Sequence, residues 1–118
     1  VIWTKLIRLS SISAITALYN CNLGTIRKSK SKTLILNTLI KEALFLSRKI
    51  FEYKETYTNI QRTIKTFPDN LTTSLQHDIN LGFNSELESQ LGAIVKLSNN
   101  HKVEIPMHKK IYSKLARQ

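Results

Sequence analysis

Glycine and proline are scarce in this chain, and that scarcity constrains its fold more than any other feature. Only three glycines and two prolines occur among 118 residues, so few positions favour a tight turn or end a regular element. No stretch sustains the alternation of apolar and polar residues that is typical of a half-buried strand, and no hairpin signal is present. The sequence therefore predicts an all-α fold, a single helical domain of about six to eight helices.

Apolar residues at helical spacing locate the helices of the first half. We expect a first helix over about residues 3–18 and a second over about 31–51. A shorter third helix carries Ile60, Ile64 and Phe67, and Pro68-Asp69-Asn70 ends it. Residues 20–27, around Gly24, are predicted to be a connection.

The second half shows the same periodicity with clearer start signals. A helix is predicted over about residues 71–81, ending at Gly82. Ser85 and Glu88 fit a Ser-x-x-Glu capping box, which predicts a new helix there. Pro106 suits the first turn of a last helix.

Composition favours one domain of a longer, cytoplasmic protein. Hydrophobic residues make up 42% of the chain, yet no apolar run approaches the roughly 18 residues that a membrane span needs. The chain begins at Val1 and shows no signal peptide, so we expect an excised domain or a natural fragment. A single cysteine, Cys21, excludes an internal disulfide and fits a reducing compartment.

A net charge of +10 favours anionic partners. Nucleic acid, an anionic small molecule and a negatively charged neighbouring domain all satisfy this condition. The densest basic cluster is Arg27, Lys28, Lys30 and Lys32, although most basic residues of such a chain are expected on solvated helix faces.

Three polar residues suit carbonyl chemistry: Lys5, Ser74 and Glu86. A lysine can donate a proton to a developing alkoxide, and a hydroxyl near a helix start can bind a carboxylate. A glutamate in a first helical turn is favoured as a carboxylate by the helix dipole. Asp78, four residues after Ser74, shares its helix face and could orient the site. Each residue alone is more often a surface lysine, a helix cap or an ordinary first-turn acid.

Lys5 would share its helix face with Leu9 and Ser13, because residues four apart are neighbours on a helix. The three histidines have no metal-type spacing and no cysteine partners, so no metal site is expected. Cys21 lies in no nucleophile signature and is expected to be a quiet, partly buried thiol.

The order and spacing of these pieces resemble the C-terminal domain of ketopantoate reductase (2-dehydropantoate 2-reductase). The resemblance spans nearly the whole chain, and its residues are Trp3-Thr4-Lys5-Leu6, residues 14–18, Asn20-Cys21, Thr73-Ser74, Asp78, Gly82, Ser85-Glu86, Gly92, residues 103–106 and Ile111-Tyr112.

The resemblance implies the substrate half of an NADPH-dependent oxidoreductase of pantothenate biosynthesis. An N-terminal Rossmann domain, absent from this chain, would bind most of the NADPH, and hydride would reduce ketopantoate or a related 2-keto acid to pantoate. Lys5 and Glu86 match the catalytic lysine and glutamate, while Ser74, Ser13 and Asp78 are assigned to substrate binding. No Gly-x-Gly-x-x-Gly fingerprint is present, so the isolated domain is expected to be inactive.

The helix face of Lys5 departs from the resemblance at two positions, and His77 stands where the family usually has glutamine. The family commonly has asparagines four and eight residues after the lysine, where this chain has Leu9 and Ser13. Leu9 cannot form a side-chain hydrogen bond, and unpaired substrate groups weaken binding. A different 2-keto acid substrate and weak or absent activity are therefore both open.

Two other classes of function remain as alternatives. A basic helical module could bind nucleic acid, although aromatic residues do not interleave with the basic cluster and no helix-turn-helix signature is evident. The apolar stripes could also form a helical dimerisation surface, so a homodimer is open. Of these partners we favour the small 2-keto acid over nucleic acid, and expect no membrane partner.

Overall fold

A computed structural model describes the backbone of residues 2–50 and 56–117 and the side chains of residues 9–50 and 56–117. In this part of the chain the regular elements are all helices, which confirms the predicted all-α class. They are α1 (Ile2–Tyr19), α2 (Leu23–Lys28), α3 (Lys30–Ile50), α4 (Tyr57–Lys65), α5 (Ser74–Asn80), α6 (Ser85–Leu87), the π-helical turn η1 (Glu88–Gly92), α7 (Ala93–Asn100) and α8 (Pro106–Ala116).

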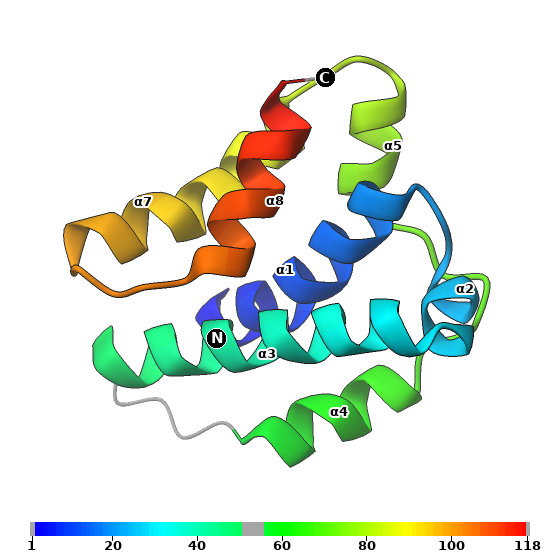
Figure 1. Ribbon diagram of the computed structural model, residues 1–118, viewed down its shortest axis with the longest axis horizontal. Helices are drawn as coiled ribbons and strands as arrows, with labels where there is room; N and C mark the ends of the chain where they lie inside the picture. Colours follow the sequence, from blue (N-terminus) through cyan, green and yellow to red (C-terminus); the bar gives the residue numbers. More distant parts are fainter. Residues whose placement is uncertain (1, 51–55, 118) are drawn as a thin grey trace.

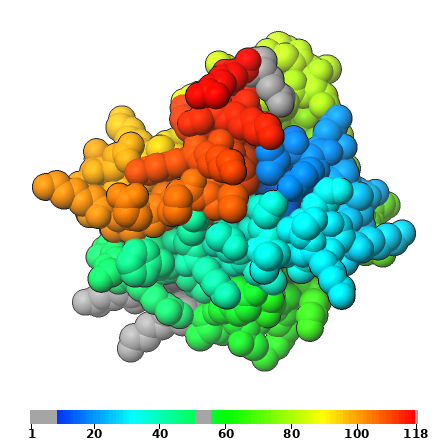
Figure 2. Space-filling view, in the orientation of Figure 1, coloured from blue at the N-terminus to red at the C-terminus, as the bar shows by residue number. Residues whose placement is uncertain are grey.

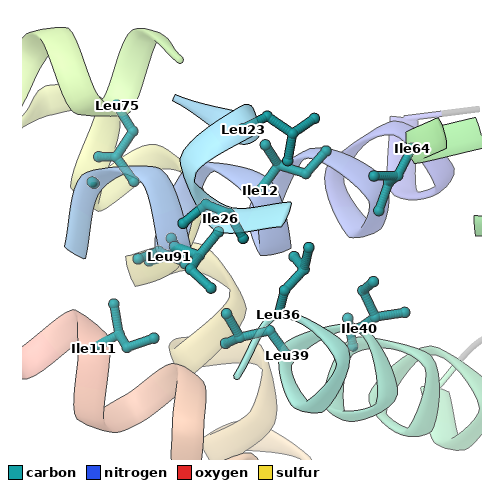
Figure 3. Packing of buried hydrophobic residues seen from close by; sticks show 14 of the residues in the cluster. Ile12, Leu23, Ile26, Leu36, Leu39, Ile40, Ile64, Leu75, Leu91 and Ile111 are labelled. Atoms are coloured by element: carbon teal, nitrogen blue, oxygen red, sulfur yellow. The ribbon is translucent and has the colours of Figure 1, made fainter. Parts of the chain in front are cut away.

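Helix α1 runs through the middle of the molecule and packs against α3, α5 and α8 (Figure 1). Its buried face includes Ile12, Ala14, Ile15 and Ala17, whereas the side chains of residues 1–8 lie outside the described residues. Figure 3 shows the apolar side chains that converge on this centre from the surrounding helices, among them Leu39, Leu91 and Ile111. One core therefore joins segments from both ends of the chain.

The prediction that residues 20–27 form a connection is wrong, because α2 begins at Leu23. The side chain of Asn22 accepts a hydrogen bond from the backbone N–H of Thr25 and caps this short helix. Gly24 lies inside it, and its N–H donates to the carbonyl of Asp69 at 2.7 Å. A Cβ at Gly24 would lie 2.8 Å from the Cβ of Asp69. The glycine therefore serves close packing against the 68–70 turn rather than a break in the helix.

The helix predicted over residues 71–81 begins three residues later, at Ser74. Thr73 is its cap, and the Thr73 hydroxyl accepts a hydrogen bond from the N–H of Gln76 at 3.3 Å. The same hydroxyl lies 2.9 Å from the hydroxyl of Thr16 on α1. The start of α5 is thus fixed against the central helix. The predicted end at Gly82 is close, since the chain turns there with a positive φ of 83°.

The predicted capping box of Ser85 and Glu88 is wrong. Asn84 occupies the cap position and makes no side-chain capping bond, and Glu88 instead accepts hydrogen bonds from the hydroxyl of Tyr112. At the start of α6, the N–H of Glu86 and the hydroxyl of Ser85 donate to Asp78 of the preceding helix. A side chain from another element has replaced the local motif.

A second, smaller apolar cluster joins α3, α7 and the segment 103–105 that precedes α8. Beside it the carboxylate of Glu42 accepts hydrogen bonds from the N–H groups of Met107 and His108 at 2.7 and 2.9 Å. The fully buried ring of His108 lies 2.8 Å from the same carboxylate. Burial would raise the pKa of Glu42, but the hydrogen bonds from His108 and the two backbone groups outweigh it and lower that pKa. Glu42 therefore caps α8 from α3.

The surface in Figure 2 shows α8 and α3 side by side, with the end of α1 and α2 beside them. Among the described residues, no helix is long and apolar enough to cross a membrane. The predicted start of the last helix at Pro106 is confirmed, as is the second helix from about residue 31.

Candidate functional site

The structure brings Ser74 and Glu86 together. Ser74 opens α5 and Glu86 lies in the short α6, twelve residues further on. The hydroxyl of Ser74 donates to Oε2 of Glu86 at 3.4 Å, at the exposed surface. Two residues that the sequence pattern paired by spacing alone are therefore neighbours in space.

Asp78 fixes the backbone that carries Glu86. Its Oδ2 accepts a hydrogen bond from the N–H of Glu86 at 2.9 Å and another from the hydroxyl of Ser85 at 3.0 Å. Both bonds satisfy groups at the start of α6, where the helix would otherwise leave donors unpaired. The geometry gives Asp78 the orienting contact that its position on the face of Ser74 had suggested.

Gln90 is a member of this cluster that sequence reasoning missed. Its Nε2 donates to Oε2 of Glu86 at 2.5 Å, the same oxygen that Ser74 contacts. Gln90 lies in η1, a π-helical turn that directly follows α6. Its spacing of four residues from Glu86 is the signal that could have found it, since such pairs share a helix face. The hydrogen bonds from Ser74 and Gln90 to the Glu86 carboxylate both end on Oε2, and none of the described side chains donates to Oε1.

The face of α1 that was predicted to hold Lys5 is only partly described. The side chain of Lys5 lies outside the described residues, so its contacts are not assigned. Leu9 is 38% exposed, whereas Ser13 is only 4% exposed. A leucine thus stands at the surface of this face, and the smaller hydroxyl of Ser13 is packed within the fold.

A polar cluster at the end of α1 also touches α5. The side-chain oxygen of Asn20 accepts hydrogen bonds from the amides of Gln76 at 3.1 Å and Asn80 at 3.0 Å. Asn20 has a positive φ of 49°, a conformation that asparagine tolerates better than most residues. Together with the contact between Thr16 and Thr73, this cluster holds α5, and so Ser74, against α1.

One cavity among the described residues does not coincide with the predicted site. It has a volume of about 460 Å³ and lies between the turn after α5 and the end of α8. Its wall contains neither Ser74 nor Glu86; it is formed by Ile79, Gly82, Phe83, Asn84, Ser85, Leu87, Glu88, Leu115 and Ala116. The hydrogen bond from Tyr112 to Glu88 raises the pKa of Tyr112, with burial and the nearby charge adding to the effect.

The basic cluster of the sequence is partly engaged in the fold. The guanidinium of Arg27 donates to Asp69 at 2.6 Å and to the carbonyls of Ile64 and Phe67 at 2.9 and 2.8 Å. The ammonium of Lys32 lies 5.0 Å from the centre of the Tyr19 ring. These cations hold helices together, so the cluster is a weaker phosphate-binding surface than the sequence suggests.

The described residues contain no group of three or more histidine, cysteine, aspartate or glutamate side chains that could hold a metal ion. Cys21 is partly buried, as predicted, and burial raises the pKa of its thiol although Lys32 acts in the opposite direction. The chemically equipped surface is therefore the cluster of Ser74, Asp78, Glu86 and Gln90. It brings one carboxylate, one hydroxyl and one amide together at the surface.

The whole chain, residues 1–118, matches the family model described as "Ketopantoate reductase PanE/ApbA C terminal". Similar solved structures include the dimeric ketopantoate reductase from Staphylococcus aureus, with a TM-score of 0.87 and 24% identity. A PanE/ApbA family ketopantoate reductase from Ralstonia eutropha gives a TM-score of 0.82 and 19% identity. Each covers 98% of this chain, which in turn covers 41% and 39% of these relatives. The chain thus spans about two fifths of their length, and no curated protein matches its sequence.

Proposed function

Since this chain belongs to the ketopantoate reductase family, as a C-terminal domain, we propose that it forms the substrate-binding half of an NADPH-dependent 2-dehydropantoate 2-reductase. The full-length protein would reduce ketopantoate, or a related 2-keto acid, to the corresponding 2-hydroxy acid in the cytoplasm, in pantothenate biosynthesis. The observation that carries the proposal is the contact between Ser74 and Glu86. Residues 1–118 would act as one domain beside an N-terminal Rossmann domain.

Each side chain of the site has a distinct role in this reaction. Lys5 would give its ammonium proton to the ketone oxygen as that oxygen becomes an alkoxide. Oε1 of Glu86, to which none of the described side chains donates, would accept a hydrogen bond from the substrate hydroxyl, and Ser74 would donate to an oxygen of the substrate. Asp78 would act mainly by holding the backbone of Glu86, which is what its two hydrogen bonds support. Ser13, which is nearly buried, would serve the substrate pocket from behind Lys5.

The residues of this domain suit the substrate rather than the nucleotide. NADPH would supply the hydride when it is bound. The three glycines, at positions 24, 82 and 92, do not form the glycine-rich turn that cradles a pyrophosphate. A domain of this composition would therefore orient the keto acid and supply the proton, while the neighbouring domain holds most of the cofactor.

The surface around Leu9 bears on which keto acid is used. An exposed leucine stands where a second hydrogen-bonding side chain would face the substrate. A substrate with fewer polar groups, or with an apolar side chain at that point, would lose less by this substitution. We therefore propose a preference for 2-keto acids less polar than ketopantoate as an alternative within the same reaction class.

The test is NADPH oxidation by the full-length protein with ketopantoate and a series of aliphatic 2-keto acids. Replacing Lys5 by methionine should lower kcat by roughly a hundredfold or more, because the alkoxide loses its proton donor. Lys102, which is exposed at the end of α7, provides the control, and Lys102→Met should retain wild-type turnover. The isolated chain should not oxidise NADPH. The absence of turnover by the full-length protein with every keto acid would refute the proposal.

The possibility of a dimer belongs to the same proposal. The Staphylococcus aureus relative is described as dimeric, and α3 carries exposed apolar side chains at Leu34 and Phe45. We expect the full-length protein to sediment as a dimer. A monomer at high concentration would remove this part of the proposal and leave the reaction unaffected.

A further inference from the structure

The side-chain amide of Gln90 donates a hydrogen bond to the carboxylate of Glu86 in the candidate site. Its amide presents Nε2 to the Glu86 carboxylate at 2.5 Å. Its other end, Oε1, is buried without a hydrogen-bond partner among the described residues. A buried carbonyl oxygen without a partner is unfavourable, so the orientation must be held by the contact at the other end.

The alternative orientation explains why this matters. Rotating the amide by half a turn would place Oε1 against Oε2 of Glu86, and two acceptors would then face each other unless the carboxyl carried a proton. The observed orientation therefore places a donor rather than an acceptor against Oε2 of Glu86. Ser74 adds a second donor to the same oxygen. Two donors, from Gln90 and Ser74, therefore meet on Oε2, and none of the described side chains donates to Oε1.

The backbone between Glu86 and Gln90 is held in place by hydrogen bonds and by a π-helical turn. Gln90 lies in the π-helical turn η1, and π-helical turns often occur at functional positions. Glu86, four residues earlier, is held at its own N–H by Asp78. Residues from α5 and η1 thus hold Glu86 at both its backbone N–H and its carboxylate.

We propose that Gln90 is a positioning residue for the Glu86 carboxylate, which keeps Oε2 occupied and presents Oε1 to the substrate. The proposal rests on the proposed function for its substrate, and on the described contacts for its geometry. It differs from a purely structural role because the amide contacts the same carboxylate oxygen as Ser74 does.

The first test uses turnover in the full-length protein. Gln90→Leu keeps the size of the side chain but removes the donor, and should lower kcat/KM for the keto acid by roughly tenfold. Gln61 donates to Tyr57 on α4, so Gln61→Leu is the matched control and should keep wild-type kcat/KM. Gln90→Glu would place a second carboxylate beside Glu86, and such a pair tends to share a proton. The acidic limb of its kcat/KM profile should therefore move to higher pH by about one unit. Unchanged turnover in Gln90→Leu, or an unchanged profile in Gln90→Glu, would overturn the proposal.

The second test does not depend on turnover. The side-chain amide resonances of Gln90 in the ¹⁵N-labelled full-length protein should shift in Glu86→Ala and stay in place in Glu88→Ala, since Glu88 binds Tyr112 instead. If the wild-type protein reduces no keto acid, the proposed function fails, and these resonances still decide the contact. If the Gln90 amide resonances do not shift in Glu86→Ala, the proposed role of Gln90 is wrong.

Discussion

Two glutamates, Glu42 and Glu86, lie beside the start of a helix and differ in their hydrogen bonds. Glu42 belongs to α3 and contacts the start of α8, whereas Glu86 lies in the first turn of α6. Glu42 accepts bonds from two backbone N–H groups and contacts the buried His108, so both of its oxygens are occupied by protein. Glu86, which is half-buried like Glu42, receives its donors from the described side chains on one oxygen, Oε2. The comparison indicates what separates the two roles. A carboxylate that stabilises the fold has protein donors on both oxygens, whereas a carboxylate that binds a ligand keeps one oxygen for it.

The surroundings of the two residues repeat this contrast. Glu42 sits beside the apolar cluster of Leu46, Ile94, Val103 and Ile105, where an unpaired donor would be costly. Glu86 is surrounded by short polar side chains from α5 and α6. Removing the first should therefore damage folding, and removing the second should damage binding and catalysis.

The largest expected effect is the loss of stability in Glu42→Ala. The substitution leaves two N–H groups of α8 and the buried ring of His108 without their acceptor, which should cost about 3 kcal/mol of the unfolding free energy. Denaturation with urea, followed by circular dichroism, measures this loss. Glu88→Ala removes an exposed carboxylate and should cost under about 1 kcal/mol. Equal losses in the two variants would break the comparison.

Glu86→Gln should lower the activity of the protein and leave its stability nearly unchanged. We expect kcat/KM of the full-length protein to fall by about a hundredfold, or about 2.7 kcal/mol of transition-state stabilisation, because a neutral amide cannot replace the carboxylate acceptor. The midpoint of urea unfolding should stay close to that of the wild type. A strongly shifted midpoint would mean that Glu86 is as structural as Glu42.

Asp78→Ala should produce a mixed and smaller effect. The start of α6 would lose its acceptor, which should cost about 1 kcal/mol of stability. Glu86 would also be held less firmly, so kcat/KM should fall by roughly tenfold. The ratio of the two losses, from the same preparations used for kinetics and urea unfolding, sharpens the comparison. A loss of stability with unchanged kinetics would leave Asp78 a structural residue only.

The smallest effect is a dependence of stability on pH. The folded state lowers the pKa of Glu42 below its ordinary value of 4.5, so its stabilisation is present above that value and is lost as the pH falls through the lowered one. The unfolding free energy should therefore decrease from about pH 5 downward. Glu42→Gln should show a shallower decrease in urea titrations at pH 7, 5 and 4. Parallel decreases in both proteins would contradict the assignment.

The helical architecture was accessible from the sequence because its signals are local. Apolar periodicity and Pro106 located the long helices within a few residues. The errors came from contacts between distant segments: Asp69 packs against Gly24 and allows α2, and Asp78 replaces the capping box at Ser85. Such contacts have no signature in a single window of sequence.

The candidate site was predictable only in part for the same reason. Ser74, Asp78 and Glu86 were identified from their order, and the structure makes Ser74 and Asp78 neighbours of Glu86. Gln90 was missed because a glutamine in a helical run carries no motif, and its donor is assigned only by the orientation of its amide. The role of Lys5 remains a prediction from the resemblance.

A crystal structure of the full-length protein with NADP⁺ and pantoate tests the central claim most directly. The account predicts the pantoate hydroxyl within hydrogen-bond distance of Oε1 of Glu86, a pantoate oxygen at Ser74, and Gln90 still on Oε2. Pantoate bound away from these residues, for example in the cavity beside Phe83 and Leu115, would contradict it.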